Sequence, residues 1–228
     1  MKSAAARGVC RMNQPGMNSM DSKWPSAAVV GIGNPLLGDD GVGIRALDQL
    51  RLRFRGALDV PLVDGGTCGP DLFAQVFGYR KLLFLDAVDI GMAPGSLARI
   101  ELNGSDLAFY RKTSLHDFSI CEVLDDLRLS GEAPDEVLVL GIQPAVISVG
   151  TSLSPAVNAA MPALIKAITQ QLLEWKVGPY IGAEFLATAT RSGPGGGAER
   201  QGEGDLGVVQ LSHLRRERDK VSRFGGIR

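Results

Sequence analysis

The sequence contains few of the residues from which disulfide frameworks, zinc sites and membrane spans are built. Its three cysteines, Cys10, Cys68 and Cys121, are odd in number and lack paired metal spacing, so we interpret them as reduced thiols of a cytosolic protein. Only two histidines are present, His116 and His213, and no HExxH motif, the usual ligand set of a zinc protease, occurs. The chain also lacks a run of 18 apolar residues, so it predicts no membrane span.

Excess charge of either sign is also missing. The 228 residues carry 24 basic and 25 acidic side chains, a net charge of −1, which gives no reason to expect nucleic acid or an anionic membrane as a partner. The first 24 residues lack the apolar segment of a secretory signal. Because 45% of the residues are hydrophobic, the chain can bury a full core. We therefore expect a cytoplasmic globular protein.

The two ends of the chain differ in composition from the middle. We predict a disordered N-terminal arm over residues 1–26, a single domain over 27–176 and a flexible Gly-rich C-terminal tail over 177–228. The tail contains the stretch RSGPGGGAERQGEGD, from Arg191 to Asp205, which is typical of a flexible linker. Everything that follows concerns the predicted domain.

Short apolar runs alternate with amphipathic segments along the domain. The apolar runs predict five strands: Ala27–Ile32, Val60–Val63, Lys81–Val88, Ser96–Leu102 and Glu136–Ile142. The segments between or after them predict helices: one from the Asp39-Asp40 pair onward, then Gly69–Phe77, His116–Leu129 and a last one with Ser154 as N-cap. This alternation predicts a three-layer α/β fold, in which helices cover both faces of a mostly parallel twisted sheet of about five strands.

The segment Ala27–Arg45 joins the first strand to the first helix through the loop GIGNPLLGDDGVG. In an open α/β sheet such a loop lies at the carboxyl ends of the strands, where ligands bind. A dinucleotide fingerprint is excluded because Leu36 replaces its third glycine, and because the adjacent Asp39 and Asp40 would repel a pyrophosphate. One of the two aspartates can cap the helix, which leaves the other for chemistry.

Three polar residues follow or close different predicted strands, namely Asp40, Asp86 and His116. Because parallel strands bring these positions to one edge of the sheet, the three side chains can lie close together. Two carboxylates and an imidazole can hold a divalent cation or act as general base and acid. Simpler interpretations remain open, since Asp86 can be a turn residue and His116 can occupy the first turn of its helix.

The order of motifs along Ala27–Trp175 is informative as a whole. GIGNPLLGDDGVG, DGGTCGPDL, FLDAVDIGMAPG, SLHDFS, GIQP and SLSPAV follow one another in the order that resembles the hydrogenase maturation endopeptidases. The resemblance implies a cytoplasmic hydrolase, grouped with the aspartic-type endopeptidases, that removes the C-terminal extension of a NiFe hydrogenase large-subunit precursor after nickel insertion.

The same resemblance implies roles for particular residues. Asp40, Asp86 and His116 are expected to contact the metal, and Asp40 or Asp86 is expected to be the catalytic carboxylate that activates water. The resemblance also implies a substrate-binding role for the residues of the DGGT motif, Asp64, Gly65, Gly66 and Thr67. From the residues alone, a tight turn in which Asp64 bonds to its own backbone is an equal alternative.

The resemblance implies the hydrogenase large-subunit precursor as the partner. One histidine and two carboxylates give a site of low affinity for free metal. We therefore expect no cofactor of the protein's own, and nickel recognised in the substrate. We also expect a monomer that binds neither nucleic acid nor a membrane. The alternative function is a non-catalytic maturation chaperone, which would hold the metal-loaded large subunit without cutting it.

Overall fold

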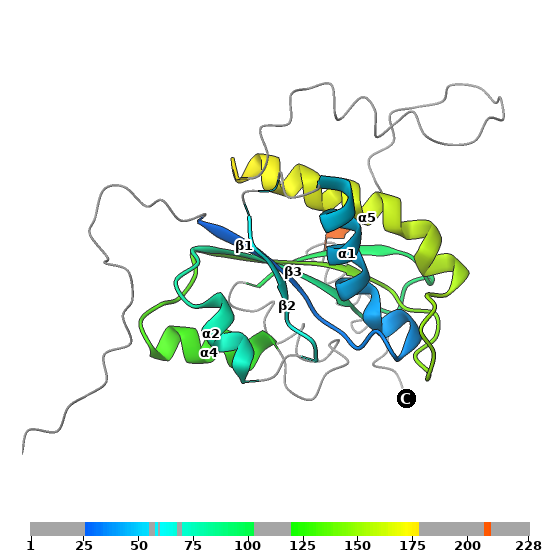
Figure 1. Ribbon diagram of the computed structural model, residues 1–228, viewed down its shortest axis with the longest axis horizontal. Helices are drawn as coiled ribbons and strands as arrows, with labels where there is room; N and C mark the ends of the chain where they lie inside the picture. The colour runs from blue at the N-terminus through cyan, green and yellow to red at the C-terminus, as the bar shows by residue number, and fades with distance from the viewer. Residues whose placement is uncertain are drawn as a thin grey trace, which may run out of the picture.

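The strands form one sheet at the centre of the molecule (Figure 1). In the computed structural model, which describes residues 26–54, 58, 60–67, 70–102, 120–177 and 208–210, this sheet has six strands in the order β2-β1-β3-β5-β4-β6. The strands are β1 (Ala27–Gly31), β2 (Leu62–Asp64), β3 (Lys81–Ala87), β4 (Leu97–Glu101), β5 (Glu136–Ile142) and β6 (Val208–Gln210). Strands β2, β1, β3 and β5 are parallel, β4 is antiparallel to β5, and β6 is parallel to β4. The predicted mostly parallel sheet is confirmed.

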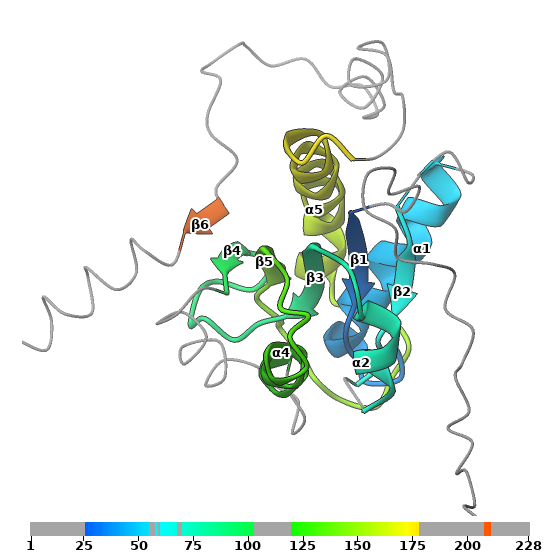
Figure 2. The ribbon, with the colours of Figure 1, turned by 90° about the vertical axis from the view of Figure 1, so that its left-hand side faces the viewer.

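Helices cover both faces of the sheet, which gives the three layers predicted from the sequence (Figures 1 and 2). One face carries α1 (Val42–Phe54) and α5 (Pro155–Glu174), and the other carries α2 (Asp71–Val76) and α4 (Ile120–Leu129). A short 3-10 turn, η1 (Gly38–Gly41), precedes α1. None of the helices in the described segments is long and apolar enough to cross a membrane.

Successive residues of the central strands β1, β3 and β5 enter two separate cores. Val29 and Leu83 pack with α1 and α5, whereas Val30 and Phe84 pack with α2 and α4. Because helices cover both faces, the central strands are apolar at nearly every position, as is usual for parallel strands. The faces of the sheet are therefore filled with packed side chains, and the ends of its strands are the places left for chemistry.

The observed elements differ from the predicted ones mainly at their ends. The predicted helix Gly69–Phe77 is α2, and the predicted strand Lys81–Val88 is β3, which ends one residue earlier. Helix α4 begins at Ile120, and the preceding residues 103–119 lie outside the described part of the chain. Strand β6 was not predicted. It lies in the segment interpreted as a flexible tail and pairs with β4, and the domain boundaries themselves stay a prediction.

Candidate active site

The loop between β1 and α1 brings backbone segments unusually close together. Gly33 has a φ of 126°, and a Cβ built on it would lie 1.8 Å from the carbonyl oxygen of Asp40. A Cβ built on Gly43, in the first turn of α1, would lie 2.2 Å from the carbonyl oxygen of Leu85 in β3. No side chain fits at either position, so these two glycines allow the loop to hold Asp40 against the end of β3.

Asp40 is fixed within this loop. It is only 4% exposed, and its Oδ2 accepts the backbone N–H of Asn34 at 2.8 Å. The Asn34 side chain in turn accepts the N–H of Leu36 at 2.9 Å, which closes a small local network. The turn η1, which carries Asp40, contacts β3. A buried carboxylate is thus held beside the carboxyl end of a central strand.

Asp86 lies at that end of β3. It is 1% exposed, and its Oδ1 accepts the N–H of the next residue, Ala87, at 2.8 Å. On the neighbouring strand β5 its register partner is Gly141, and on the other side Ile32 donates its N–H to Leu85 at 2.8 Å. The chain therefore leaves β1 next to Asp86. The structure thus brings Asp40 and Asp86 to the same edge of the sheet, the one formed by the carboxyl ends of the parallel strands.

The third predicted metal contact, His116, lies outside the described residues. Within the segments that are described, no group of three or more His, Cys, Asp or Glu side chains is arranged to hold a metal ion. Asp40 and Asp86 supply carboxylate oxygens, which divalent cations accept as ligands. The complete set of metal contacts stays a prediction.

The DGGT motif lies directly beside the first loop. Gly33 donates its N–H to the carbonyl oxygen of Gly66 at 2.6 Å, and Gly65 donates to the carbonyl oxygen of Gly31 at 2.9 Å. Asp64 is exposed, and its Oδ1 accepts the N–H of Gly66 at 3.0 Å. Asp64 thus forms the local turn that the sequence left open as an alternative. A substrate-binding role for the motif stays a prediction.

Asp39 has surroundings unlike those of Asp40. It is fully buried; its Oδ2 accepts the N–H groups of Ala145 at 2.8 Å and Val146 at 3.0 Å, and its Oδ1 accepts that of Ser154 at 2.6 Å. Burial by itself raises the pKa of a carboxyl group, but here the backbone N–H groups outweigh it and hold the pKa of Asp39 below its ordinary value.

These bonds bear on the expectation that one of the two aspartates caps the helix after them. Asp39 was a candidate cap for the helix that follows it, yet it binds the amides of a distant loop and the start of α5. The only signal in the sequence was that two adjacent aspartates cannot both cap one helix. The expected N-cap of α5 is confirmed, because Ser154 Oγ accepts the N–H of Val157 at 3.4 Å.

Gln143, from the GIQP motif, joins two loops at the same edge. Its Oε1 accepts the N–H groups of Ile90 at 2.9 Å and Met92 at 3.2 Å, and its Nε2 donates to Asp89 at 3.1 Å. Sequence reasoning assigned no role to this side chain. Of the buried polar side chains in the described segments, all but Gln171 lie at this edge. The loops after β1, β3 and β5 are therefore joined by buried polar groups.

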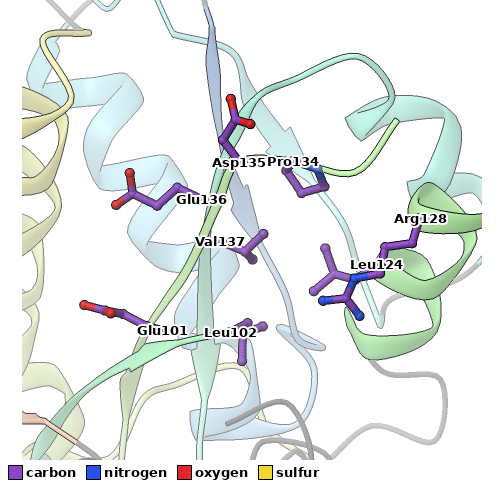
Figure 3. A pocket seen from close by; sticks show the side chains of 8 residues that line it. All are labelled: Glu101, Leu102, Leu124, Arg128, Pro134, Asp135, Glu136 and Val137. Atoms are coloured by element: carbon purple, nitrogen blue, oxygen red, sulfur yellow. The ribbon is translucent and has the colours of Figure 1, made fainter. Parts of the chain in front are cut away.

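A pocket of about 230 Å³ lies elsewhere on the molecule (Figure 3). It is lined by residues of β4, β5 and α4, among them Glu136 and Val137 at the start of β5. Asp86 pairs with Gly141, five residues further along β5, which corresponds to about 16 Å of strand. The pocket is therefore at the opposite end of the parallel strands and does not belong to the site around Asp40 and Asp86.

Known proteins resemble this chain in sequence and in fold. The family model for the hydrogenase maturation protease HycI matches residues 44–171. The chain belongs to the hydrogenase maturation protease family. It is 36% identical over 162 residues to the hydrogenase expression/formation protein HoxM of Cupriavidus necator, which covers 70% of this chain and 80% of that protein. To the hydrogenase 2 maturation protease of Escherichia coli it is 30% identical over 147 residues, 64% of this chain and 90% of that one.

The hydrogenase maturating endopeptidase HybD from E. coli has the same fold, with a TM-score of 0.59 and 24% identity over 68% of this chain and 97% of that chain. The resemblance seen in the order of motifs is therefore confirmed, and membership in this protease family makes the chain a peptidase. The region matched by the family model includes Asp86. Asp40 lies outside it, four residues before its first residue, 44. For this hydrogenase maturation protease, the edge with two buried carboxylates is the candidate active site.

Proposed function

We propose that the chain is the endopeptidase that removes the C-terminal extension of a NiFe hydrogenase large-subunit precursor after nickel insertion. Family membership supports a peptidase of hydrogenase maturation. The observation that carries the proposal is the pair Asp40 and Asp86, two carboxylates at most 4% exposed that two different strands bring to one edge of the sheet. Carboxylates are rarely buried to this extent, and the carboxyl ends of the strands in an open α/β sheet are where ligands bind, which favours a chemical role.

Nickel enters this proposal as part of the substrate. Asp40, Asp86 and His116 are proposed to contact an ion that the precursor already holds, and the protein is proposed to have no cofactor of its own. Two carboxylates and an imidazole form a weak and unselective site for a free ion. When the ion is already held by the precursor, the same three contacts strengthen binding of the nickel-loaded precursor. Cleavage then depends on nickel insertion.

Cleavage itself requires that a water molecule lose a proton. One of Asp40 and Asp86 is proposed to take that proton, in line with an aspartic-type grouping, while the water oxygen adds to the scissile carbonyl carbon. The C–N bond then breaks, and the amine of the released extension takes up the proton. A positioned general base of this kind contributes a rate factor of about 10²–10⁴.

Recognition of the precursor is proposed to involve the DGGT motif, Asp64, Gly65, Gly66 and Thr67. These residues lie next to the loop of Asp40 through the bond between Gly33 and Gly66. Without side chains on two successive residues, the backbone can approach a bound peptide closely. The enzyme is further proposed to act in the cytoplasm as a monomer, with the precursor as its partner and without nucleic acid or membrane.

The purified chain, mixed with nickel-loaded or nickel-free precursor, tests this function. Mass spectrometry is expected to show loss of the extension from the loaded precursor alone, without added ions, and elemental analysis of the enzyme is expected to show no stoichiometric metal. Equal cleavage of the nickel-free precursor would overturn recognition of nickel, and tightly bound zinc would point to a catalytic metal. A stable complex without mass loss would instead favour the chaperone.

A further inference from the structure

The loop between β5 and α5 lies on the surface with little apolar burial to hold it. Residues 145–152, which we term the β5–α5 loop, are all exposed, and Val149 is 91% exposed. A segment with few buried contacts opens easily unless hydrogen bonds fix it. The bonds that reach this loop from other parts of the chain therefore determine its position.

Most of these bonds come from the first loop, residues 34–38, together with Asp39 directly after it. Gly38 donates its N–H to the carbonyl oxygen of Gly150 at 2.8 Å, and Gly150 donates to that of Leu36 at 2.9 Å. Asp39 adds a backbone bond to the carbonyl oxygen of Val146 at 3.2 Å. Exposed backbone bonds of this kind compete with water, so they contribute little on their own.

The Asp39 carboxylate is different because it is completely buried. Its two oxygens accept three N–H groups, two from the start of the β5–α5 loop and one from Ser154 just after its end. Hydrogen bonds to a charged acceptor away from water are stronger than neutral, exposed ones. A second side chain also reaches the loop, since Arg45 donates to the carbonyl oxygen of Thr151.

We propose that Asp39 is a positioning residue, which holds the β5–α5 loop against the 34–38 loop so that the two loops form a substrate-contacting wall beside Asp40. The substrate part of this statement rests on the proposed function. Asp39 itself does not reach the substrate, because it is 0% exposed and both of its oxygens are engaged by backbone amides.

The wall has the character of a surface for an apolar peptide. Leu36 is 61% exposed, Val146 53% and Ile147 43%, and together with Val149 they place four apolar side chains on these two loops. The wall is continuous with the candidate site, because Asn34 links Leu36 to the Asp40 carboxylate. The occupant that fits is therefore the apolar part of the precursor segment next to the scissile bond.

The substitution Asp39→Asn in the full chain tests the positioning. It keeps the shape of the side chain but replaces one acceptor oxygen with an amide nitrogen, which cannot accept an N–H group. Hydrogen–deuterium exchange is expected to accelerate at least about tenfold at the amides of 145–154, the effect of one lost hydrogen bond to a charged group, and to stay unchanged in β3. The KM for the nickel-loaded precursor is expected to rise about tenfold by the same measure, with kcat changed less than threefold.

Two further variants complete the experiment. Arg45→Gln removes the other side-chain anchor and is expected to cause a smaller increase in loop exchange and in KM, so it carries the test if Asp39→Asn does not fold. Asp48→Asn removes an exposed carboxylate that pairs with Arg51 on α1, and is expected to change neither quantity. Loop exchange that stays at the wild-type rate in Asp39→Asn would overturn the proposal.

A large loss of kcat with normal loop exchange and KM would also overturn it, because Asp39 would then act in the chemistry. Faster exchange throughout the domain would show a general structural role and would equally contradict the proposal. Wild-type protein that cleaves no precursor would refute the proposed function. In that case the exchange measurement would still decide whether Asp39 positions the loop.

Discussion

Gly43→Ala is the substitution that most directly tests how the fold builds the site. Gly43 is the second residue of α1, where alanine is the better helix former by about 1 kcal/mol. Intrinsic propensity alone therefore predicts a more stable protein. The structure predicts the reverse, because the added Cβ would lie 2.2 Å from the carbonyl oxygen of Leu85 and 2.3 Å from that of Ile32.

The size of the expected effect follows from those distances. An ordinary contact of a Cβ begins at 3.4 Å, so α1 must move away from the strand ends by about 1.2 Å. Both obstructing atoms are backbone oxygens, one in β3 and one directly after β1, and they cannot rotate away as a side chain could. Overpacking of this kind costs about 1–3 kcal/mol of stability. Nearly all of that range exceeds the gain in helix propensity. The middle of that range leaves a net loss of about 1 kcal/mol, which for a domain of this size lowers the melting temperature by about 2–4 °C.

The same movement has a consequence for activity. Asp40 lies three residues before Gly43 and moves with the start of α1, whereas Asp86 stays on β3. A displacement of about 1 Å between catalytic groups can reduce a rate by about 100-fold. We therefore expect cleavage of the nickel-loaded precursor to fall by that factor at temperatures where the variant is fully folded.

Thermal unfolding followed by circular dichroism, together with a cleavage assay on the same samples, measures both effects. Gly131→Ala is the control, since Gly131 has a φ of 81° and a Cβ there meets no atom within 4 Å. It is expected to lose some stability through backbone strain but to keep full activity. A Gly43→Ala protein as stable and as active as the wild type would refute the close approach of α1 to the sheet.

The remaining predictions concern the acids, the histidine and the tail. Precursor cleavage is expected to fall by at least about 100-fold in each of the variants Asp40→Asn, Asp86→Asn and His116→Ala, because a general base or a metal contact is lost. Far-ultraviolet circular dichroism is expected to stay unchanged. Normal cleavage by all three variants would disprove the site. The lowered pKa of Asp39 means that its contribution to the free energy of unfolding is complete above its ordinary pKa of 3.8 and is lost as the pH falls through the lower folded value. Urea unfolding from pH 6 to pH 2 is therefore expected to show the stability difference between wild type and Asp39→Asn shrinking below that pH, and a constant difference would contradict this. Truncation after Lys176 is expected to change the melting temperature little, because the few backbone bonds of β6, about 1 kcal/mol each, are offset by the entropy of ordering its residues; a large drop would show that the tail docks firmly.

The sequence predicts the sheet well because its signals are local. The run from Lys81 to Val88 is apolar and short, which suits a strand buried on both faces, and β3 ends within one residue of the prediction. The Asp64 turn was a stated alternative for the same reason, since its partner Gly66 is two residues away. Strand β6 lacks such a signal, because three residues carry too little pattern to predict pairing with β4.

Local signals could not predict that Asp39 and Asp40 have different surroundings. The two residues are adjacent and chemically identical, and what separates them is the set of amides around Asp39. Those amides, of Ala145, Val146 and Ser154, are 106, 107 and 115 residues further along the chain. Only the folded sheet brings them together, so the local sequence is equally compatible with either aspartate as the one used in chemistry.

The separation between Asp39 and Ser154 also sets how long after its own synthesis the Asp39 carboxylate must wait for its partners during translation. At about 5–20 residues per second, the 115 residues between them take about 6–23 s to synthesise. Until then the Asp39 carboxylate has no amides to accept, and the loop that carries Asp40 lacks its opposite wall. A chain that ends before the start of α5 therefore lacks the amides that bind Asp39, and the loops around the candidate active site are not yet joined.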